Sequence, residues 1–416
     1  MKIRELFIAL IFTVVATSAL AVPVELEQLI SEAEANPKLL SVAEQIVVAE
    51  TKVAQMTALP DPELSLAFSS YPLDSLRTDR SPMTGNEIRL AQKFPFPGKL
   101  KLKGEIAEKQ KEWFAAAYEE ERLNIRRQVK DAWYRLLFQR QAIELTNRNL
   151  KLLDDFIRLT ETRYAVGQGL QQNVLHAHLR RSVQLDKLLV LTQQETTTLA
   201  ELNTLADRPT ESLLATSVQL EQSNEHFDFD SLKEQAEQNR PLFTAYDALL
   251  EQAIAQKRLA ELEYRPDFTL WASYRFRDDS LADGGTDFIS AGVSFNLPIR
   301  RERRAAAVAE AGSESVLVMR QRDNFKNQVG LEVYRAITSF NQASELADLY
   351  RSGIIPQADQ TFQAALTAYQ VNKAGFSEPL DALMTLYRYQ IEHVRALSDQ
   401  QRSLAALEAA TAQRFD

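Results

Sequence analysis

Hydrophobic and polar residues alternate along four short stretches of the chain. These stretches are residues 64–69, 88–94, 268–277 and 289–297. In the first of them, Leu64, Leu66 and Phe68 are separated by serine and alanine. A period of two places every second side chain on the same face of a strand. We therefore predict four strands, each with one apolar and one polar face.

The length of these strands leaves two interpretations open. An antiparallel sheet can lie on a soluble core, but each stretch also has about the 9–11 residues that a tilted strand needs to cross a bilayer. Four strands cannot close a membrane barrel, because the smallest barrels have about eight. If the strands cross a membrane, further copies of the chain must pair their edges, which predicts an oligomer.

Most of the remaining chain has the pattern of long helices. Residues 100–164 contain no proline, which allows a helix of ~65 residues, about 100 Å long. Within it, mainly apolar residues recur in alternating steps of 4 and 3, as in a coiled-coil seam, and a few members of this seam are polar. The seam consists of Ile125, Val129, Ala132, Leu136, Gln139, Ile143, Thr146, Leu150, Leu153, Ile157, Thr160 and Tyr164. The break at Gly167-Gln168-Gly169 then forces an antiparallel return helix over residues 172–206.

The second half of the chain repeats this order. A long helix begins near Arg301, a turn follows at residues 372–377, and the return helix has a seam from Leu380 to Leu404. Pro356 interrupts the long helix and should kink it.

Matching segments lie 200 to 205 residues apart in the two halves. Phe94-Pro95-Phe96-Pro97 corresponds to Phe295-Asn296-Leu297-Pro298, and Tyr164-Ala165-Val166 corresponds to Tyr369-Gln370-Val371. A shorter helix precedes the strands in each half, over residues 24–59 and 231–264. We therefore predict a tandem duplication. Its parts are a signal peptide (1–21), a first repeat (22–208), a linker (209–230) and a second repeat (231–416).

The first 21 residues have the pattern of a secretory signal. Lys2 and Arg4 precede an apolar stretch, and Ala19-Leu20-Ala21 forms a small-residue cleavage site. An uncleaved membrane anchor is the weaker alternative, because the apolar stretch is short for a ~20-residue span. Removing Lys2, Arg4 and Glu5 takes away a net +1 and moves the formal charge from −9 to −10. This acidic balance argues against nucleic-acid binding.

The chain offers little for catalysis or metal binding. It has no cysteine and only four histidines, and His176 and His178 are two residues apart, so they do not share a helix face. No phosphate-binding glycine loop or nucleophile elbow is visible. We therefore predict a protein that is not an enzyme and needs no cofactor or metal. A secreted enzyme that uses scattered carboxylates is the weaker alternative.

The order of a signal peptide, two strand pairs and two long helical hairpins resembles the TolC-like outer-membrane efflux proteins. The resemblance covers essentially the whole mature chain. Three segments are most similar to members paired with resistance-nodulation-division pumps, including the heavy-metal subgroup. They are LPDPEL (59–64), QKFPFPGKLKLKGEIA (92–107) and IIPQADQTF…AYQV (354–371).

The resemblance implies a mainly α-helical protomer with a small β part. Three protomers would form a 12-stranded β-barrel in the outer membrane of a Gram-negative bacterium, continuous with a periplasmic helical tunnel. It also implies a passive exit duct that works with a periplasmic membrane-fusion adaptor and an inner-membrane pump, and that contacts outer-membrane lipid. Two alternatives stay open: an outer-membrane component of type I protein secretion, and a periplasmic coiled-coil scaffold without channel activity.

The two hairpin turns carry the sites that the resemblance implies. The adaptor-contacting tips are Val166, Gly167, Gln168, Gly169 and Leu170 in the first turn, and Asn372, Lys373, Gly375 and Phe376 in the second. The glycines also fit a turn that only reverses the chain.

The resemblance further implies a periplasmic gate formed by Glu378, Asp381 and Tyr369. In a trimer the acidic pair would set six carboxylates around one opening, which attracts cations. The alternative is helix-start chemistry, with Ser377 as N-cap and acids in the first turn. A tip arginine that some members have is missing, because Ala374 stands there, and Lys373 is the available substitute.

The strand-to-helix junctions are the remaining predicted site. They consist of Pro95, Pro97, Gly98 and Pro298. The prolines end strand pairing, and the glycine permits a turn into the long helix. We expect Lys99, Lys101 and Lys103 to lie at the inner boundary between membrane and water, where long basic side chains can reach lipid headgroups.

Overall fold

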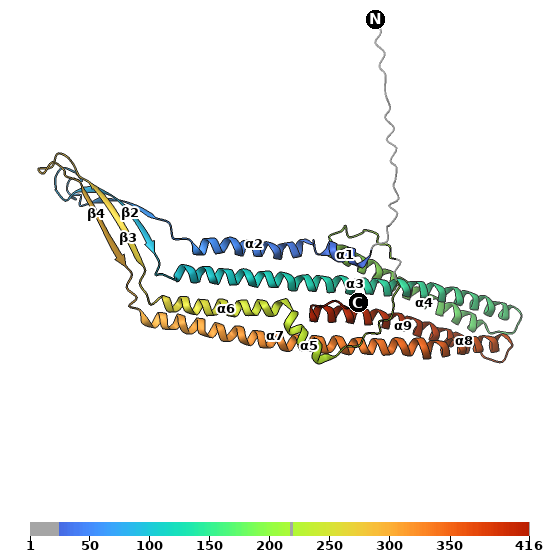
Figure 1. The fold of residues 1–416 in the computed structure, drawn as a ribbon. Coiled ribbons are helices and arrows are strands. Elements are labelled where there is room, and N and C mark those ends of the chain that lie inside the picture. Colours follow the sequence, from blue (N-terminus) through green and yellow to red (C-terminus); the bar gives the residue numbers. More distant parts are fainter. Residues whose placement is uncertain (1–24, 217–218, 416) are drawn as a thin grey trace, which may run out of the picture.

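The computed structural model describes residues 25–216 and 219–415, which form two long helical hairpins and one four-stranded sheet (Figure 1). The first half contains α1 (Leu26–Ala33), α2 (Pro37–Thr57), β1 (Glu63–Ser69), β2 (Gly85–Phe94), α3 (Lys99–Ala165) and α4 (Gln171–Leu205). The second half contains α5 (Phe229–Asn239), α6 (Pro241–Leu262), β3 (Phe268–Phe276), β4 (Phe288–Phe295), α7 (Arg301–Leu349), a π-helical turn (Tyr350–Ile354), α8 (Ile355–Gln370) and α9 (Ser377–Thr411). The predicted fold class, mainly helical with a small sheet, is confirmed.

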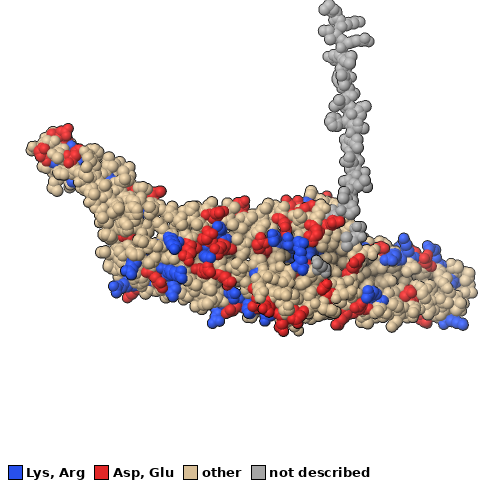
Figure 2. Space-filling model, viewed as in Figure 1, with Lys and Arg blue, Asp and Glu red and all other residues tan. Residues whose placement is uncertain are grey.

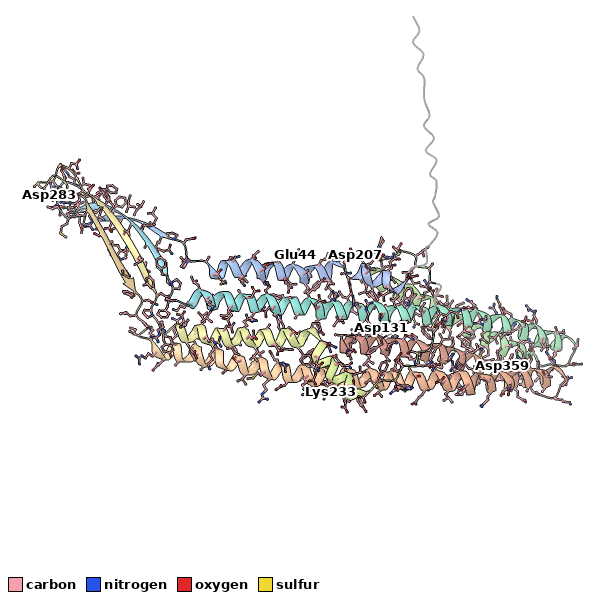
Figure 3. The ribbon with its side chains drawn as sticks, in the orientation of Figure 1. Glu44, Asp131, Asp207, Lys233, Asp283 and Asp359 are labelled. Atoms are coloured by element: carbon pink, nitrogen blue, oxygen red, sulfur yellow. The ribbon has the colours of Figure 1, made fainter. Side chains whose placement is uncertain are left out.

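The molecule is elongated, with the sheet at one end and the turns of both hairpins at the other (Figure 1). Helix α3 runs along most of this length and packs against α2, α4, α6 and α9. Helix α7 packs against α6 and α9. In Figure 3, Asp283 marks the outermost loops of the sheet and Asp359 lies on α8 towards the opposite end. The fold therefore separates a sheet end from a hairpin end.

Each of the two shorter helices predicted before the strands is in fact a pair of helices. The first pair breaks at Asn36 and the second at Arg240, and a proline occupies the first helical position after each break. Proline fits that position because the first N–H groups of a helix have no internal partner. The Asn36 side chain caps α2 by accepting a hydrogen bond from the Lys38 N–H at 2.9 Å. The prediction of unbroken helices over 24–59 and 231–264 was therefore wrong, and residue 24 lies outside the described residues.

The predicted seam of the first long helix is buried along most of its length. Leu136 and Leu153 are fully buried, and the Thr146 hydroxyl lies 2.9 Å from the Tyr387 hydroxyl of α9. Ile143 is only half-buried, and Tyr164 is 47% exposed. The assignment of Tyr164 to the seam was therefore wrong.

The predicted interruption at Pro356 takes the form of a π-helical turn. This turn spans Tyr350–Ile354, immediately before the proline, and α8 continues from Ile355. Proline lacks an N–H and its ring clashes with the preceding turn, so a wider turn accommodates it within a continuous helix.

The sheet has the strand order β1-β2-β3-β4, and all neighbours are antiparallel. Its register brings the predicted apolar positions together on one face, with Leu66 opposite Ile88 and Leu270 opposite Val293. These side chains are exposed, from 39% for Ile88 to 69% for Leu66. Charged groups are sparse over the sheet in Figure 2 except at its loop end, whereas they are dense over the helices. The sheet therefore presents a continuous apolar face that the rest of the described chain leaves uncovered.

The two halves are joined by residues 209–228, which precede α5. Leu214 and Leu220 are buried against the helices, and Arg140 donates to the Leu214 carbonyl at 2.7 Å. The predicted signal peptide lies outside the described residues. None of the helices in residues 25–216 and 219–415 has an apolar stretch long enough to cross a bilayer.

Candidate functional site

Both hairpins turn through the same backbone motif. Gly167 in the first turn has a φ of 76° and Asn372 in the second has a φ of 62°. In each turn the next residue donates its N–H back across the helix end: Gln168 to the Arg163 carbonyl and Lys373 to the Ala368 carbonyl, both at 2.8 Å. This is a Schellman motif, which favours glycine or asparagine at the left-handed position. The turn residues therefore satisfy the last carbonyls of α3 and α8.

Most of the predicted tip residues are exposed. Val166 and Leu170 are each 63% exposed and Val371 is 58% exposed. Gly167, Gln168, Asn372, Lys373 and Gly375 are exposed as well, whereas Gly169 and Phe376 are half-buried. The two turns therefore offer apolar side chains to solvent.

Phe376 belongs to an aromatic cluster that joins the two hairpins. Its ring lies 5.5 Å from the ring of Phe156 on α3, which is in turn 5.6 Å from the ring of Tyr369 on α8. Tyr369 is only 4% exposed. Since buried aromatic pairs add to the energy of packing, this cluster holds the second hairpin turn against the first hairpin.

Arg163 reaches Tyr369 from the opposite hairpin. Its guanidinium carbon lies 4.1 Å from the centre of the Tyr369 ring, and its Nη2 donates to the Gln370 carbonyl at 2.8 Å. Only 9% of Arg163 is exposed. A cation at the last carbonyls of a helix is favourable, so Arg163 stabilises the end of α8.

Sequence reasoning missed Arg163. After Thr160 the seam of α3 can continue by three residues to Arg163 or by four to Tyr164, and apolar character favoured the tyrosine. The structure buries Arg163 and exposes Tyr164. Lys373, the predicted substitute for the missing tip arginine, is exposed.

The predicted acidic pair lies on the first turns of α9, and both residues are exposed. The Glu378 carboxylate accepts the Gly375 N–H at 3.1 Å. Asp381 instead reaches across to Arg180 of α4, with 3.7 Å between Oδ1 and Nη2. Ser377 is the first helical residue, and Phe376 occupies the N-cap position without a side-chain cap. The prediction of Ser377 as N-cap was wrong, and Glu378 takes the helix-start role.

A groove of about 710 Å³ separates α4 from α9 next to this pair. Arg180 and Asp381 stand on its two sides, and Gln184, which is 1% exposed, donates to the Met384 sulfur at 3.3 Å. The two hairpins therefore meet near their turns through two polar contacts that span this groove.

The strand-to-helix junctions are organised around Asp267. Its Oδ1 accepts the Phe96 N–H at 2.9 Å and the Lys99 ammonium at 2.8 Å, and its carbonyl accepts the Asn296 N–H at 3.3 Å. Gly98 has a φ of 95°, which explains why glycine stands at the turn between Pro97 and α3. The ends of β2 and β4 are thus tied to Asp267 at the start of β3, the first through its carboxylate and the second through its backbone carbonyl.

Lys99 is 2% exposed and also lies 3.3 Å from Glu263. The expectation that Lys99 reaches lipid headgroups was therefore wrong, because an internal carboxylate pair binds its ammonium group. Lys101 and Lys103 are exposed. Burial alone would raise the pKa of the Asp267 carboxyl, but the Lys99 ammonium and the Phe96 N–H outweigh it and lower this pKa below its ordinary 3.8.

No group of three or more histidine and acidic side chains within residues 25–216 and 219–415 has the geometry to hold a metal ion. The histidine nearest the hairpin turns, His176, packs its ring 6.1 Å from Phe376. The contacts of the site are thus those of packing and ion pairing between helices.

A sequence model of outer membrane efflux proteins matches this chain twice, over residues 29–207 and 232–413. The chain belongs to the outer membrane efflux protein family. No curated protein sequence matches it.

Several solved structures share its fold. The outer membrane protein VceC of Vibrio cholerae is 21% identical, with a TM-score of 0.78 over 94% of this chain and 97% of VceC. A membrane protein of Pseudomonas aeruginosa is 17% identical, with a TM-score of 0.80 over 94% of each chain. The open state of the MtrE outer membrane channel of Neisseria gonorrhoeae is 18% identical, with a TM-score of 0.77 over 93% of this chain and 89% of MtrE. The described chain thus has the fold of these three proteins over nearly its whole length.

Proposed function

We propose that three copies of this chain form an outer-membrane channel that serves as the passive exit duct of a tripartite efflux pump. The observation that carries the proposal is the four-stranded sheet, whose continuous apolar face is exposed and whose outer strands, β1 and β4, each have one neighbour. Three such sheets would supply twelve strands, enough to close a membrane barrel. The number three comes from the resemblance to TolC-like proteins.

The helices would extend this duct through the periplasm. Helix α3 has 67 residues, which corresponds to about 100 Å at 1.5 Å per residue. With the sheet in the outer membrane, the hairpin turns would lie far from it on the periplasmic side. There the exposed Val166, Leu170 and Val371 would contact a periplasmic membrane-fusion adaptor, and an inner-membrane pump, of resistance-nodulation-division type, would supply the energy.

The entrance would be formed by the second hairpin turn, with Glu378 and Asp381 of each copy around the opening. Arg163 would hold this turn in its resting position through Tyr369 and the Gln370 carbonyl. Adaptor binding at the turns would release it. In this proposal, the gate would consist of contacts between the two hairpins of one chain.

Conductance in planar bilayers tests the proposal. The purified full-length protein should insert and give discrete conductance steps, and chemical cross-linking in the membrane should trap a trimer. Recovery of the protein in the soluble periplasmic fraction, without conductance, would contradict a channel and favour the periplasmic scaffold.

Two neighbouring positions on β1 provide a matched pair of variants. Leu66→Arg places a charge on the apolar face, which costs about 2–4 kcal/mol near the middle of a bilayer, and should reduce membrane insertion. Ala67→Arg places the same charge on the polar face, opposite Glu87, and should insert normally. Equal insertion of both variants would contradict the assignment of the lipid-facing side.

A further inference from the structure

The end of the sheet nearest the helices is bordered by five exposed cations. We call them the basic rim: Lys101, Lys103, Arg300, Arg301 and Arg303. Within the described part of the chain, no carboxylate lies within 4.0 Å of any of these five groups. Glu302, also exposed, is the single acidic residue interspersed among the three arginines. The rim therefore has a net positive charge, and none of its five cations forms an ion pair within residues 25–216 and 219–415.

The basic rim begins where the apolar face of the sheet ends. A row of three phenylalanines closes that face, because Phe94 is opposite Phe268 and Phe268 is opposite Phe295 in the register of the strands. The rings of Phe94 and Phe268 are stacked, with 5.4 Å between their centres. Aromatic rows of this kind mark the boundary between the hydrocarbon and headgroup regions of a membrane. The rim therefore lies at the level expected for lipid headgroups.

The β4 side of the sheet shows the same order. Leu297 is 75% exposed and Ile299 is 79% exposed, and Arg300 follows directly. In Figure 2, lysine and arginine side chains (blue) lie where α7 begins, beside the end of the sheet. An apolar segment that leads into unpaired arginines matches the two chemical parts of a phospholipid, the acyl chains and the phosphate.

The two parts of the rim flank one point of the fold. Glu263, at the end of α6, binds Lys99 of α3 through its carboxylate at 3.3 Å and accepts the Arg304 Nε of α7 through its carbonyl at 2.6 Å. The beginnings of α3 and α7 are thus fixed to the same helix end. The lysines and arginines of the rim therefore border the same helix end from two sides, although they are about 200 residues apart in sequence.

The position of these cations is electrostatically unfavourable within the chain itself. Lys101 belongs to the first turn of α3, and Arg301 and Arg303 belong to the first turn of α7. The amino end of a helix has a partial positive charge, which disfavours cations there. An external anion at the rim would offset this repulsion.

We propose that the basic rim binds the phosphate groups of anionic phospholipids in the membrane leaflet that faces the periplasm. The phenylalanine row and Leu297 would contact the acyl chains of the same lipids. This inference rests on the proposed function, because it requires the sheet to lie in the outer membrane. It adds a lipid class, phosphatidylglycerol and related anionic lipids, and a binding surface on the protein.

Native mass spectrometry of the full-length protein, released from detergent with added lipid, measures the binding directly. Wild-type protein should retain phosphatidylglycerol in preference to phosphatidylcholine. Lys101→Gln with Lys103→Gln should weaken the retention of phosphatidylglycerol roughly 30-fold, given the attraction of each basic residue to an anionic surface. Arg301→Gln with Arg303→Gln should have a similar effect, and added salt should weaken the wild-type preference.

Arg148→Gln with Lys151→Gln is the matched control, because it removes two exposed cations from the same helix α3, far from the sheet. This variant should retain the lipid as wild type does. Equal retention of both lipids by wild type, or an equal loss in the control, would overturn the proposal. Conductance in a bilayer of phosphatidylcholine distinguishes lipid binding at the basic rim from the proposed channel function. If the wild-type protein conducts but has no lipid preference, only the lipid-binding proposal is refuted. If it never inserts, the channel itself is refuted.

Discussion

The guanidinium group of Arg163 lies over the ring of Tyr369, with 4.1 Å between its central carbon and the ring centre. The two residues belong to different hairpins and are both at least nine-tenths buried. The same guanidinium donates to the Gln370 carbonyl at the end of α8. One side chain thus joins the first hairpin to the turn of the second.

Replacement of this arginine should loosen the second turn. Arg163→Ala removes a charge-assisted hydrogen bond and a cation–π contact, together worth about 2 kcal/mol, which corresponds to a roughly 30-fold larger population of separated turns. The chain has no cysteine, so spin labels on Gln168→Cys and Lys373→Cys report the distance between the turns. Its distribution should broaden in the variant.

Arg158→Ala is the matched control for this experiment. Arg158 lies on the same helix, is 70% exposed and pairs with Asp155 three residues away. The label distances should stay as in wild type. Arg163→Lys keeps the charge but loses the planar stack, so it should give an intermediate result. Unchanged distances in Arg163→Ala would contradict the role of Arg163 between the hairpins.

The acidic pair on α9 should control ion selectivity if it surrounds the channel entrance. Glu378→Gln with Asp381→Asn removes two carboxylates per chain and also frees Arg180, which lies 3.7 Å from Asp381. Both changes make the entrance less attractive to cations. The permeability ratio of K⁺ to Cl⁻, measured from the reversal potential in planar bilayers, should fall towards unity.

Glu345→Gln with Asp359→Asn is the control for charge alone. Both residues are exposed on α7 and α8, away from the turn. This variant should keep most of the wild-type selectivity. An equal drop in both double variants would assign the selectivity to total charge instead of the entrance, and no drop in either would sink the gate assignment.

The ion pair between Asp267 and Lys99 should make the junction of sheet and helices sensitive to acid. Asp267→Asn leaves the ammonium of Lys99 buried with a weaker partner, which costs about 3 kcal/mol and should lower the melting temperature. Asp279 is exposed in the loop between β3 and β4, so Asp279→Asn should have little effect on the melting temperature.

The pH dependence follows from the lowered pKa of Asp267. A carboxyl whose folded pKa lies below its ordinary 3.8 contributes stability that is fully present above that value and lost as the pH falls through the lowered pKa. The difference in melting temperature between wild type and Asp267→Asn should therefore shrink below pH 3.8. A constant difference down to pH 2, well below the ordinary carboxyl range, would contradict this linkage.

Local patterns in the sequence predicted the strands and most of the long-helix seam. The period of two needs no knowledge of neighbouring segments, and the register of the sheet confirms it, with Leu66 opposite Ile88. The helix breaks before Pro37 and Pro241 were visible as well, because proline favours the first helical position. The predicted helices 24–59 and 231–264 nevertheless ran across them.

Contacts between distant segments could not be predicted in this way. Lys99 is buried because Asp267, 168 residues later, lies beside it, and no local pattern reports that approach. Arg163 was passed over for Tyr164 because the facing surface of the second hairpin, not apolar character, decides which residue continues the seam. The errors therefore lie where the two halves of the chain meet.

Trp271 and Gly292 provide a test of the polar face of the sheet. The two residues are paired between β3 and β4, and a Cβ at position 292 would lie 2.6 Å from the indole Cζ2. On β2, Arg89 holds its guanidinium carbon 4.2 Å from the centre of the same ring. Gly292→Val should displace the indole, at a cost of about 1–3 kcal/mol for overpacking, and should lower the yield of membrane-inserted protein.

Trp271→Leu in the Gly292→Val background should recover the yield, because the smaller side chain makes room for the valine. Ala291→Val is the control, since Ala291 is exposed on the apolar face of the same strand and has room for two more methyl groups. Insertion is measured as the heat-resistant fraction of protein extracted from outer membranes. If Ala291→Val lowers the yield of inserted protein as much as Gly292→Val does, β4 tolerates no larger residue at either position and the indole is not the specific cause. If Trp271→Leu does not restore the yield of Gly292→Val, a clash with the indole is likewise contradicted.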